Sequence, residues 1–189
     1  MKKFNVTSGV MVCSDPCYEI PTWCQGIVEN VKNGEWEAEV ETSDEGGWGE
    51  RIAVLKVNHV NAKLTGGFEL LNFDGGVDSG QFGFFDRDFY RNDEVAKDLS
   101  KHDFGEGYDK EDGDSWYRAV CELTLAEESW GVLSGGAVSS SGFGDGSYNV
   151  YGCKDESGQY VAFYVEYIGG DDYDDEDEWD EDEWDEDEE

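Results

Sequence analysis

Three of the five cysteines lie within the first 24 residues and form the densest cluster of reactive side chains in the chain. They are Cys13, Cys17 and Cys24, and Ser14-Asp15-Pro16 stands between the first two. A structural zinc site usually takes two pairs of Cys or His ligands at short spacing, and a thiol nucleophile needs a histidine base. Both histidines are distant in the sequence and isolated. Buried, inert thiols are therefore the favoured interpretation, with zinc binding and catalysis as alternatives.

Asp and Gly are concentrated between Asp74 and Gln81, and two further carboxylates, Asp86 and Asp88, follow. Carboxylate and carbonyl oxygens at this density can bind calcium or magnesium. The segment lacks the twelve-residue pattern of a calcium-binding loop, and Asp and Gly also build tight turns. We therefore expect a turn here and no metal site.

A second Gly-rich segment, Gly142 to Ser147, follows three consecutive serines. A phosphate-binding loop would need a Lys after the glycines and a helix behind them. This segment has no Lys and runs into a strand pattern, so we expect a structural bend. His59 is expected to be structural, and since neither His59 nor His102 lies in a recognisable pattern, no Ser-His-Asp triad can be assigned. A small hydrolase or metal-dependent enzyme would have to use the weak catalytic candidates Asp15, Cys17, Asp78 and Asp145.

Several segments that must position these residues alternate with period two, as half-buried strands do. From Glu35 to Glu41, every Glu lies on one face, and Trp36, Ala38 and Val40 lie on the other. The same alternation predicts strands from Tyr117 to Leu125 and from Val161 to Tyr167. Further strands are expected at residues 27–31, 51–60, 81–85 and 148–153.

Turn signals connect some of these strands. Asn33-Gly34 predicts a hairpin between residues 27–31 and 35–41, and residues 155–158 predict a second one before the last strand. Helix signals are few: Asp86 or Asp88 could cap a segment to about Lys101, with a loop from Lys101 to Ser115. We therefore predict a mainly β fold, or an α+β fold with one short helix. It is a compact, antiparallel, β-sandwich-like single domain over residues 1–168.

The charge of the chain excludes several functions. The 189 residues carry a net charge of −34, which disfavours direct binding to nucleic acids or anionic membranes. No apolar run approaches the ~20 residues of a membrane span, and the polar N-terminus lacks the apolar core of a secretion signal. We expect a cytoplasmic protein with reduced thiols and no cofactor.

The C-terminal segment differs in composition from the rest. Sixteen of the 19 residues from Asp171 to Glu189 are acidic, which leaves −18 of the −34 on residues 1–170. We expect residues 169–189 to form a Gly-Gly joint and a disordered tail with a W-D-E-D-E repeat.

The spacing of charges in this tail resembles that of a nucleic acid strand. An extended chain places its carboxylates about 4 Å apart, close to the ~3.4 Å between phosphates along one strand, and tryptophans stack as bases do. The tail is therefore either a nucleic-acid mimic that binds a basic partner or a solubilising segment. The partner-binding candidates are Trp179, Asp180, Glu181, Asp182, Glu183 and Trp184.

Blocks of the sequence resemble an uncharacterised domain-of-unknown-function family of bacteria and their phages. The blocks are Thr7 to Tyr18, Thr22 to Cys24, Gly47 to Gly49, Gly76 to Gln81, and Val138 to Tyr148. The resemblance covers most of residues 5–168 and implies a small, soluble cytoplasmic protein of a bacterium or, where a phage encodes it, of the host cytoplasm. It implies no activity, and the acidic tail looks like an addition to the family pattern.

These observations lead to one expected function and two alternatives. We expect a non-enzymatic acidic binding or accessory protein. It would engage a basic partner, such as a nucleic-acid-binding protein, through its acidic surface and tail. The first alternative is the small hydrolase or metal-dependent enzyme, and the second is a purely structural module.

Overall fold

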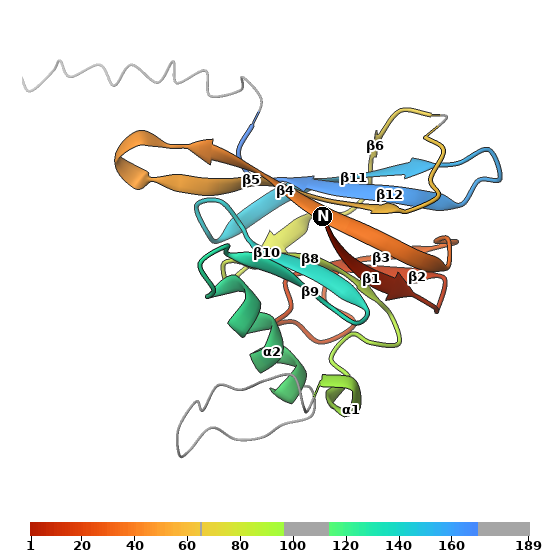
Figure 1. The fold of residues 1–189 in the computed structure, drawn as a ribbon, viewed down its shortest axis with the longest axis horizontal. Helices are drawn as coiled ribbons and strands as arrows, with labels where there is room; N and C mark the ends of the chain where they lie inside the picture. The colour runs from red at the N-terminus through yellow and green to blue at the C-terminus, as the bar shows by residue number, and fades with distance from the viewer. Residues whose placement is uncertain (65, 97–113, 170–189) are drawn as a thin grey trace, which may run out of the picture.

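Two antiparallel sheets pack face to face, as predicted for a β-sandwich (Figure 1). The computed structural model describes residues 1–64, 66–96 and 114–169. Within them, the upper sheet in Figure 1, sheet A, has the order β1-β4-β5-β12-β11-β6, with β7 paired to β11. Its strands are β1 (Lys2–Val6), β4 (Gly34–Asp44), β5 (Glu50–His59), β6 (Glu69–Leu70), β7 (Gly75–Val77), β11 (Gly146–Lys154) and β12 (Tyr160–Glu166).

The lower sheet, sheet B, has the order β3-β2-β8-β10-β9. Its strands are β2 (Val10–Ser14), β3 (Gly26–Glu29), β8 (Gln81–Asp86), β9 (Trp130–Leu133) and β10 (Gly136–Ser140). The helices are α1 (Asp93–Ala96), α2 (Asp114–Thr124) and a 3-10 turn, η1 (Gly46–Trp48). Helix α2 covers the side of sheet B that faces away from sheet A (Figure 1).

Aromatic side chains fill the space between the sheets. Phe163 of β12 stacks on Trp36 of β4 at 5.9 Å and on Phe84 of β8 at 5.8 Å. All three are fully buried, and each aromatic side chain buries roughly 150–250 Å². The alternation in the sequence explains this core, because every second residue of β4 points inward. A second, smaller cluster forms where Trp116 and Val120 of α2 meet Phe85 of β8.

Most of the predicted strands are confirmed. Strands β4, β5, β8, β11 and β12 occupy the predicted segments, and β11 pairs with β12 across the predicted turn. In that turn, Asp155 accepts the backbone N–H of Ser157 at 2.9 Å, and Gly158 adopts a φ of 82°. The Gly-rich segment bends at residues 142–145, between β10 and β11, as expected, and Gly146 begins β11.

The predicted hairpin at Asn33-Gly34 is wrong. Strand β3 pairs with β2 in sheet B, whereas β4 pairs with β1 and β5 in sheet A. The chain crosses from one sheet to the other between them, with Asn30 at a φ of 61°. The Asn33-Gly34 turn signal is local, whereas the partner of a strand is decided by which apolar side chains are buried together. Strand β4 pairs with β1 in a register that sets Phe4 opposite Trp36, and both side chains are buried in the core.

The predicted strand from Tyr117 to Leu125 is also wrong, because most of this segment is helix α2. Trp116, Ala119, Val120 and Leu123 follow the spacing of three to four residues of a helix face, and the first three are buried. Leu125, which a strand would place on the same apolar face as Tyr117, is 78% exposed. Alternating apolar residues satisfied both periods over this short stretch, and packing on sheet B selected the helix.

The helix predicted from Asp86 or Asp88 begins later. Asp86 ends strand β8, and α1 starts at Asp93. Asp86 is fully buried, and its carboxylate binds backbone amides of another loop. The predicted continuation to Lys101 and most of the predicted loop to Ser115 lie outside the described residues, as does the tail beyond Gly169.

Candidate functional site

Three segments that are far apart in the sequence meet where the strands β2, β7 and β10 end. They are the loop after β2 (residues 15–18), the turn after β7 (residues 78–80) and the bend between β10 and β11 (residues 141–145). Asp15 joins the first two segments by hydrogen bonds. The Ser141 N–H donates to the Gly80 carbonyl at 3.0 Å, and Gly146 pairs with Val77, which brings in the third. We call these segments the three-loop junction.

Asp15 lies at the centre of this junction and is fully buried. Its Oδ1 accepts the Cys17 N–H at 2.8 Å and the Ser79 hydroxyl at 2.6 Å. Its Oδ2 accepts the N–H groups of Asp78 at 2.8 Å and Ser79 at 2.7 Å. A carboxylate has about four lone-pair sites, so these four donors occupy them. The geometry makes Asp15 a cross-link between two loops.

Cys17 is half-buried beside this carboxylate. Burial, together with the nearby charges of Asp15 and Asp78, raises the pKa of its thiol to about 12. The thiolate is the nucleophilic form, and reactive cysteines have a lowered pKa. The environment of Cys17 therefore keeps the thiol protonated. All five cysteines are free thiols; Cys13, Cys24 and Cys153 are buried, and Cys17 and Cys121 are half-buried.

The two remaining catalytic candidates lie at the surface of the junction. Asp78 is exposed next to the Tyr18 hydroxyl, whose pKa is raised by burial and then by Asp78 and Cys24. Asp145 is also exposed. The pairing of β7 with β11 ends at Val77 and Gly146, one residue before Asp78 and Asp145. The structure thus brings Asp15, Cys17 and Asp78 into contact and places Asp145 on the neighbouring bend.

Two residues that the sequence analysis did not identify as candidates bind the backbone carbonyls of the loop after β2. The Tyr90 hydroxyl lies 2.7 Å from the Tyr18 carbonyl and 3.1 Å from the Asp15 carbonyl. Arg91 donates to the Pro16 carbonyl at 3.2 Å and to the Cys17 carbonyl at 3.3 Å. They stand more than 70 residues away along the chain, and no local pattern links them to this loop. Arg91 adopts a φ of 53°, which is uncommon outside glycine.

Asp86 cross-links a different pair of loops in the same way. It accepts the backbone N–H groups of Thr7, Ser8 and Asp88, and the Ser8 bond measures 2.9 Å. Residues 78–80, between β7 and β8, form the turn that was predicted for this Asp- and Gly-rich segment. In the described parts of the chain, no group of three or more His, Cys, Asp or Glu side chains could hold a metal ion. His59 is buried and accepts the Asn61 N–H at 3.1 Å, as expected of a structural histidine.

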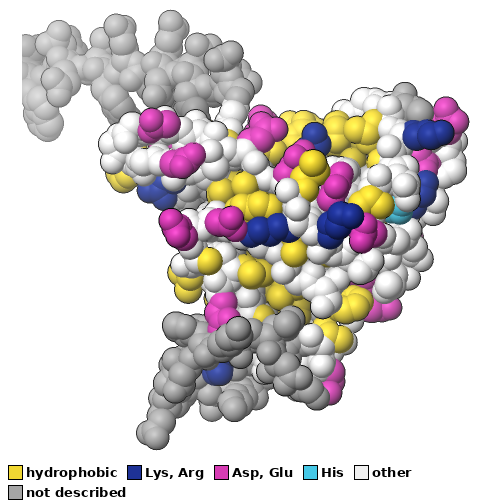
Figure 2. Space-filling view, in the orientation of Figure 1, with side chains coloured by type: hydrophobic (Ala, Val, Ile, Leu, Met, Phe, Trp, Pro, Cys, Tyr) yellow, Lys and Arg dark blue, Asp and Glu magenta, His cyan; other side chains and the backbone are white. Residues whose placement is uncertain are grey.

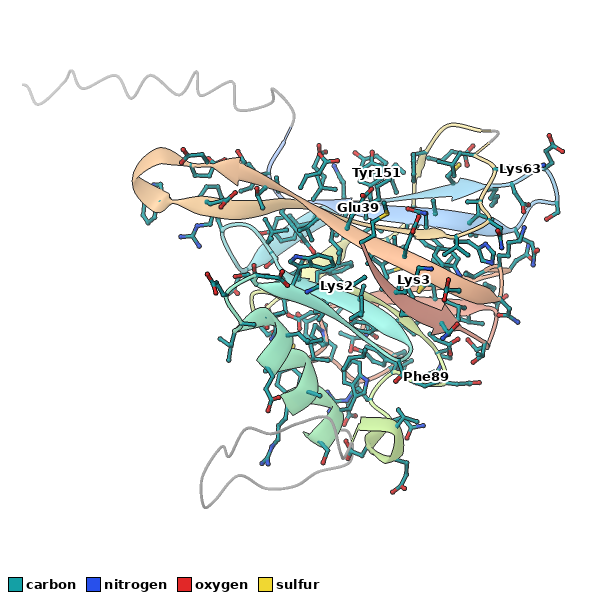
Figure 3. The ribbon with its side chains drawn as sticks, viewed as in Figure 1. Lys2, Lys3, Glu39, Lys63, Phe89 and Tyr151 are labelled. Carbon is teal, nitrogen blue, oxygen red and sulfur yellow. The ribbon has the colours of Figure 1, made fainter. Side chains whose placement is uncertain are left out.

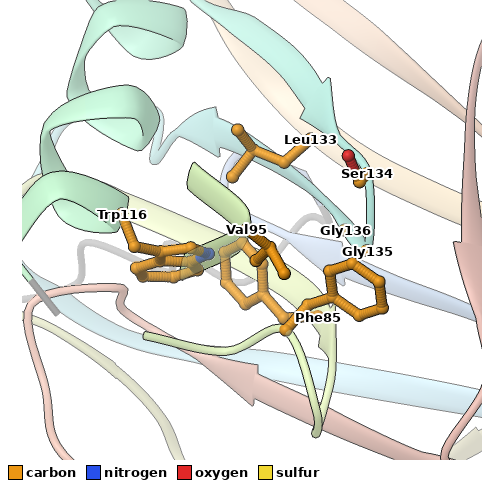
Figure 4. Close-up of a pocket in the computed structure, with 8 residues that line it drawn as sticks. Phe85, Val95, Trp116, Leu133, Ser134, Gly135 and Gly136 are labelled. Atoms are coloured by element: carbon orange, nitrogen blue, oxygen red, sulfur yellow. The ribbon is translucent and has the colours of Figure 1, made fainter. Parts of the chain in front are cut away.

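Three clefts of the described surface are lined by residues other than the four catalytic candidates, and one of them, of about 660 Å³, borders Tyr90 and Arg91. An apolar pocket near α1 and α2 is lined by Phe85, Phe89, Val95, Trp116 and Leu133 (Figure 4). Its volume of about 10 Å³ is the space of roughly one water molecule. A wider cleft of about 310 Å³ separates the β4–β5 hairpin from β9 and is lined partly by charged residues. None of the four catalytic candidates lines any of these three clefts.

The segments of the three-loop junction are also those that carried the family resemblance. A family model described as "Protein of unknown function (DUF4241)" matches residues 4–165. The chain belongs to this family. In this DUF4241 protein the matched region ends inside β12, so the acidic tail lies beyond it. No curated protein and no solved structure matches the chain.

The described part of this DUF4241 protein has no helix that is both long and apolar enough to cross a membrane. Its two buried carboxylates, Asp15 and Asp86, hold loops that carry family blocks. We conclude that the SDPC and VDSG segments are held together by backbone hydrogen bonds to Asp15.

Proposed function

We propose that this DUF4241 protein is a non-enzymatic acidic binding protein that engages a basic partner through the outer face of sheet A and its acidic tail. The observation that carries the proposal is the arrangement of Glu37, Glu39 and Glu41. Alternation along β4 places all three on the side of sheet A that faces away from the core. A positively charged surface would meet a regular row of carboxylates there.

The β4–β5 hairpin has a strong excess of negative charge. Residues 34–59 include seven carboxylates but only two basic side chains, Arg51 and Lys56. Lys56 lies 3.9 Å from Glu39 and is therefore already engaged. In the face shown in Figure 2, Lys and Arg side chains lie next to Asp and Glu side chains. Arg51 donates to the Trp48 carbonyl at 3.1 Å, and the hairpin therefore keeps a net negative charge that a basic partner would neutralise.

Two observations favour binding over the hydrolase alternative. All four lone-pair sites of Asp15 are used by loop donors, so it could act as a base only by giving up a hydrogen bond. Cys17 is held as a thiol by burial and two carboxylates. The contact between Asp15, Cys17 and Asp78 is explained by their role in holding the loops.

The tail is included in this proposal because of its acidic sequence alone. Its candidates, from Trp179 to Trp184, lie outside the described residues. Sixteen carboxylates would add a second, extended anionic surface to the one on sheet A. We place the protein in the cytoplasm, that of the host if a phage encodes it, where basic nucleic-acid-binding proteins are available as partners.

The proposal can be tested with a labelled Lys-rich peptide and the full chain. Replacing Glu37, Glu39 and Glu41 with Gln should lower the affinity roughly fivefold, since exposed ion pairs contribute modestly. The affinity should also depend less steeply on salt, because fewer ion pairs form. Fluorescence anisotropy at several salt concentrations measures both effects.

The matched control removes the same charge elsewhere. Glu19, Glu29 and Glu156 are exposed on other parts of the molecule. Their replacement with Gln should leave the affinity within twofold of the native value. An equal loss in both triple variants would mean that the charge acts diffusely and that the face of β4 is not a binding surface.

A further inference from the structure

The outer face of sheet A carries a transverse row of cross-strand neighbours. The pairing registers place Glu39 of β4 opposite Lys56 of β5, and Lys56 opposite Tyr164 of β12. They also place Tyr164 opposite Tyr151 of β11, and Tyr151 opposite Leu70 of β6. Figure 3 shows Tyr151 on the side of sheet A that faces away from sheet B. One end of the row is charged, and the other is aromatic and apolar.

The aromatic end is a preformed stack. The rings of Tyr151 and Tyr164 lie 4.5 Å apart and 13° from parallel. Phe68 contacts Tyr164 edge to face at 4.9 Å. These three side chains are half-buried, and Leu70 beside them is 59% exposed. Aromatic and apolar groups at the solvent face of a sheet, surrounded by charges, mark an interaction surface.

Carboxylates border this stack. The row next to it runs from Glu41 through Val54 to Glu166 and Asn149. Among the ion pairs of the described residues, none involves Glu41 or Glu166. Burial raises the pKa of Tyr164, and the neighbouring Tyr151 and Glu166 raise it further. Lys56, the cation opposite Tyr164, lies 3.9 Å from Glu39, so the remaining charges beside the rings, Glu41 and Glu166, are negative and favour a cationic partner.

We propose that Tyr151 and Tyr164 form a docking platform for arginine side chains of a basic protein segment. A guanidinium group is planar, so it can stack on a tyrosine ring while it pairs with a carboxylate such as Glu166. A lysine ammonium would gain the charge attraction but less from the rings. This inference rests on the proposed function and adds the chemical class of the partner.

The charge of the protein selects between the classes of partner that aromatic rings attract. Nucleic acid bases also stack on tyrosine, but their phosphates would meet Glu39, Glu41 and Glu166. With a net charge of −34, the chain would repel them. A segment that carries arginine can stack on the tyrosine rings and form ion pairs with the carboxylates at the same time.

The experiment compares two labelled peptides of equal length and charge, one of alternating Arg and Ser and the other of alternating Lys and Ser. With the full chain at physiological salt, the Arg peptide should bind about tenfold more tightly, as expected for two exposed cation–π contacts. Replacing both tyrosines with Leu should remove this preference and leave the affinity for the Lys peptide unchanged. Replacing both with Phe keeps the rings and should preserve the preference.

Trp23 supplies a matched control, because it is 83% exposed on the loop before β3. Trp23→Leu should leave the Arg preference intact. Equal binding of the two peptides, or an Arg preference that survives in the Leu variant, would overturn the platform while keeping the proposed acidic binding. Tyrosine-dependent binding of a single-stranded DNA oligonucleotide would overturn it too. Failure of both peptides to bind would instead overturn the proposed function.

Discussion

The Asp15 carboxylate accepts the backbone N–H of Ser79 at 2.7 Å, although 64 residues separate them. This bond and three others hold the loops after β2 and β7 in place. Asp15 needs these four donors because a buried charge is costly without hydrogen bonds, and the buried donors need Asp15 as their acceptor. Removing it would leave several N–H groups without an acceptor.

Asp15→Ala should lower the free energy of unfolding by about 3 kcal/mol or more, because each unsatisfied buried donor costs roughly 1–3 kcal/mol. Urea denaturation followed by tryptophan fluorescence measures the change. Asp145→Ala removes an exposed carboxylate on the neighbouring bend and should stay within about 0.5 kcal/mol of the native value. Comparable losses of stability in both variants would contradict the role of Asp15 as a cross-link between the two loops.

Cys17 should react slowly with thiol reagents at pH 8. With a pKa of about 12, its thiolate fraction there is far below that of an ordinary cysteine, whose pKa is about 8.5. Mass spectrometry after timed labelling of the native and the urea-unfolded chain identifies the modified residue. Labelling of native Cys17 as fast as in the unfolded chain would revive the nucleophile interpretation.

The same pKa predicts how stability varies at alkaline pH. The folded state raises the pKa of Cys17, so its contribution is fully present below the unfolded pKa and is lost as pH rises toward 12. The urea midpoint of the native chain should therefore fall more steeply above pH 9 than that of Cys17→Ser. Parallel curves of urea midpoint against pH for the two proteins would show that the titration of Cys17 does not contribute to the loss of stability at alkaline pH.

Gly76 should not tolerate a side chain. A Cβ atom there would lie 2.6 Å from the Cβ of Cys24, so Gly76→Ala should cost about 1–3 kcal/mol of stability. Gly47 has open space around it and is the matched control, expected within about 0.5 kcal/mol. Thermal unfolding of both variants tests the contrast, and an unchanged midpoint for Gly76→Ala would refute the close contact.

Deleting residues 171–189 should leave the thermal midpoint within a few degrees, because the composition changes abruptly after Gly170. The loss of sixteen like charges could raise the midpoint slightly by easing repulsion. A fall of more than about 10 °C in calorimetry would mean that the tail contributes to the folded body. Reversing the sequence of the tail keeps its charge and should also leave the midpoint unchanged.

Much of the fold was predictable from local patterns. The alternation from Glu35 to Glu41 set both faces of β4, one with Trp36 in the core and one with carboxylates in solvent. It therefore also set the acidic surface on which the proposed function rests. Period-two patterns are reliable here because a strand between core and water needs one apolar face and one polar face.

The tertiary structure decided what local patterns leave open. Tyr117 to Leu125 fitted a strand as well as a helix, and packing of Trp116 and Val120 on sheet B selected the helix. The sequence named Asp15, Cys17 and Asp78 as candidates, but it could not show that the Asp15 oxygens are taken up by backbone amides. Those bonds, like the stack of Tyr151 on Tyr164, depend on strand pairing between distant segments, and no local pattern encodes such pairing.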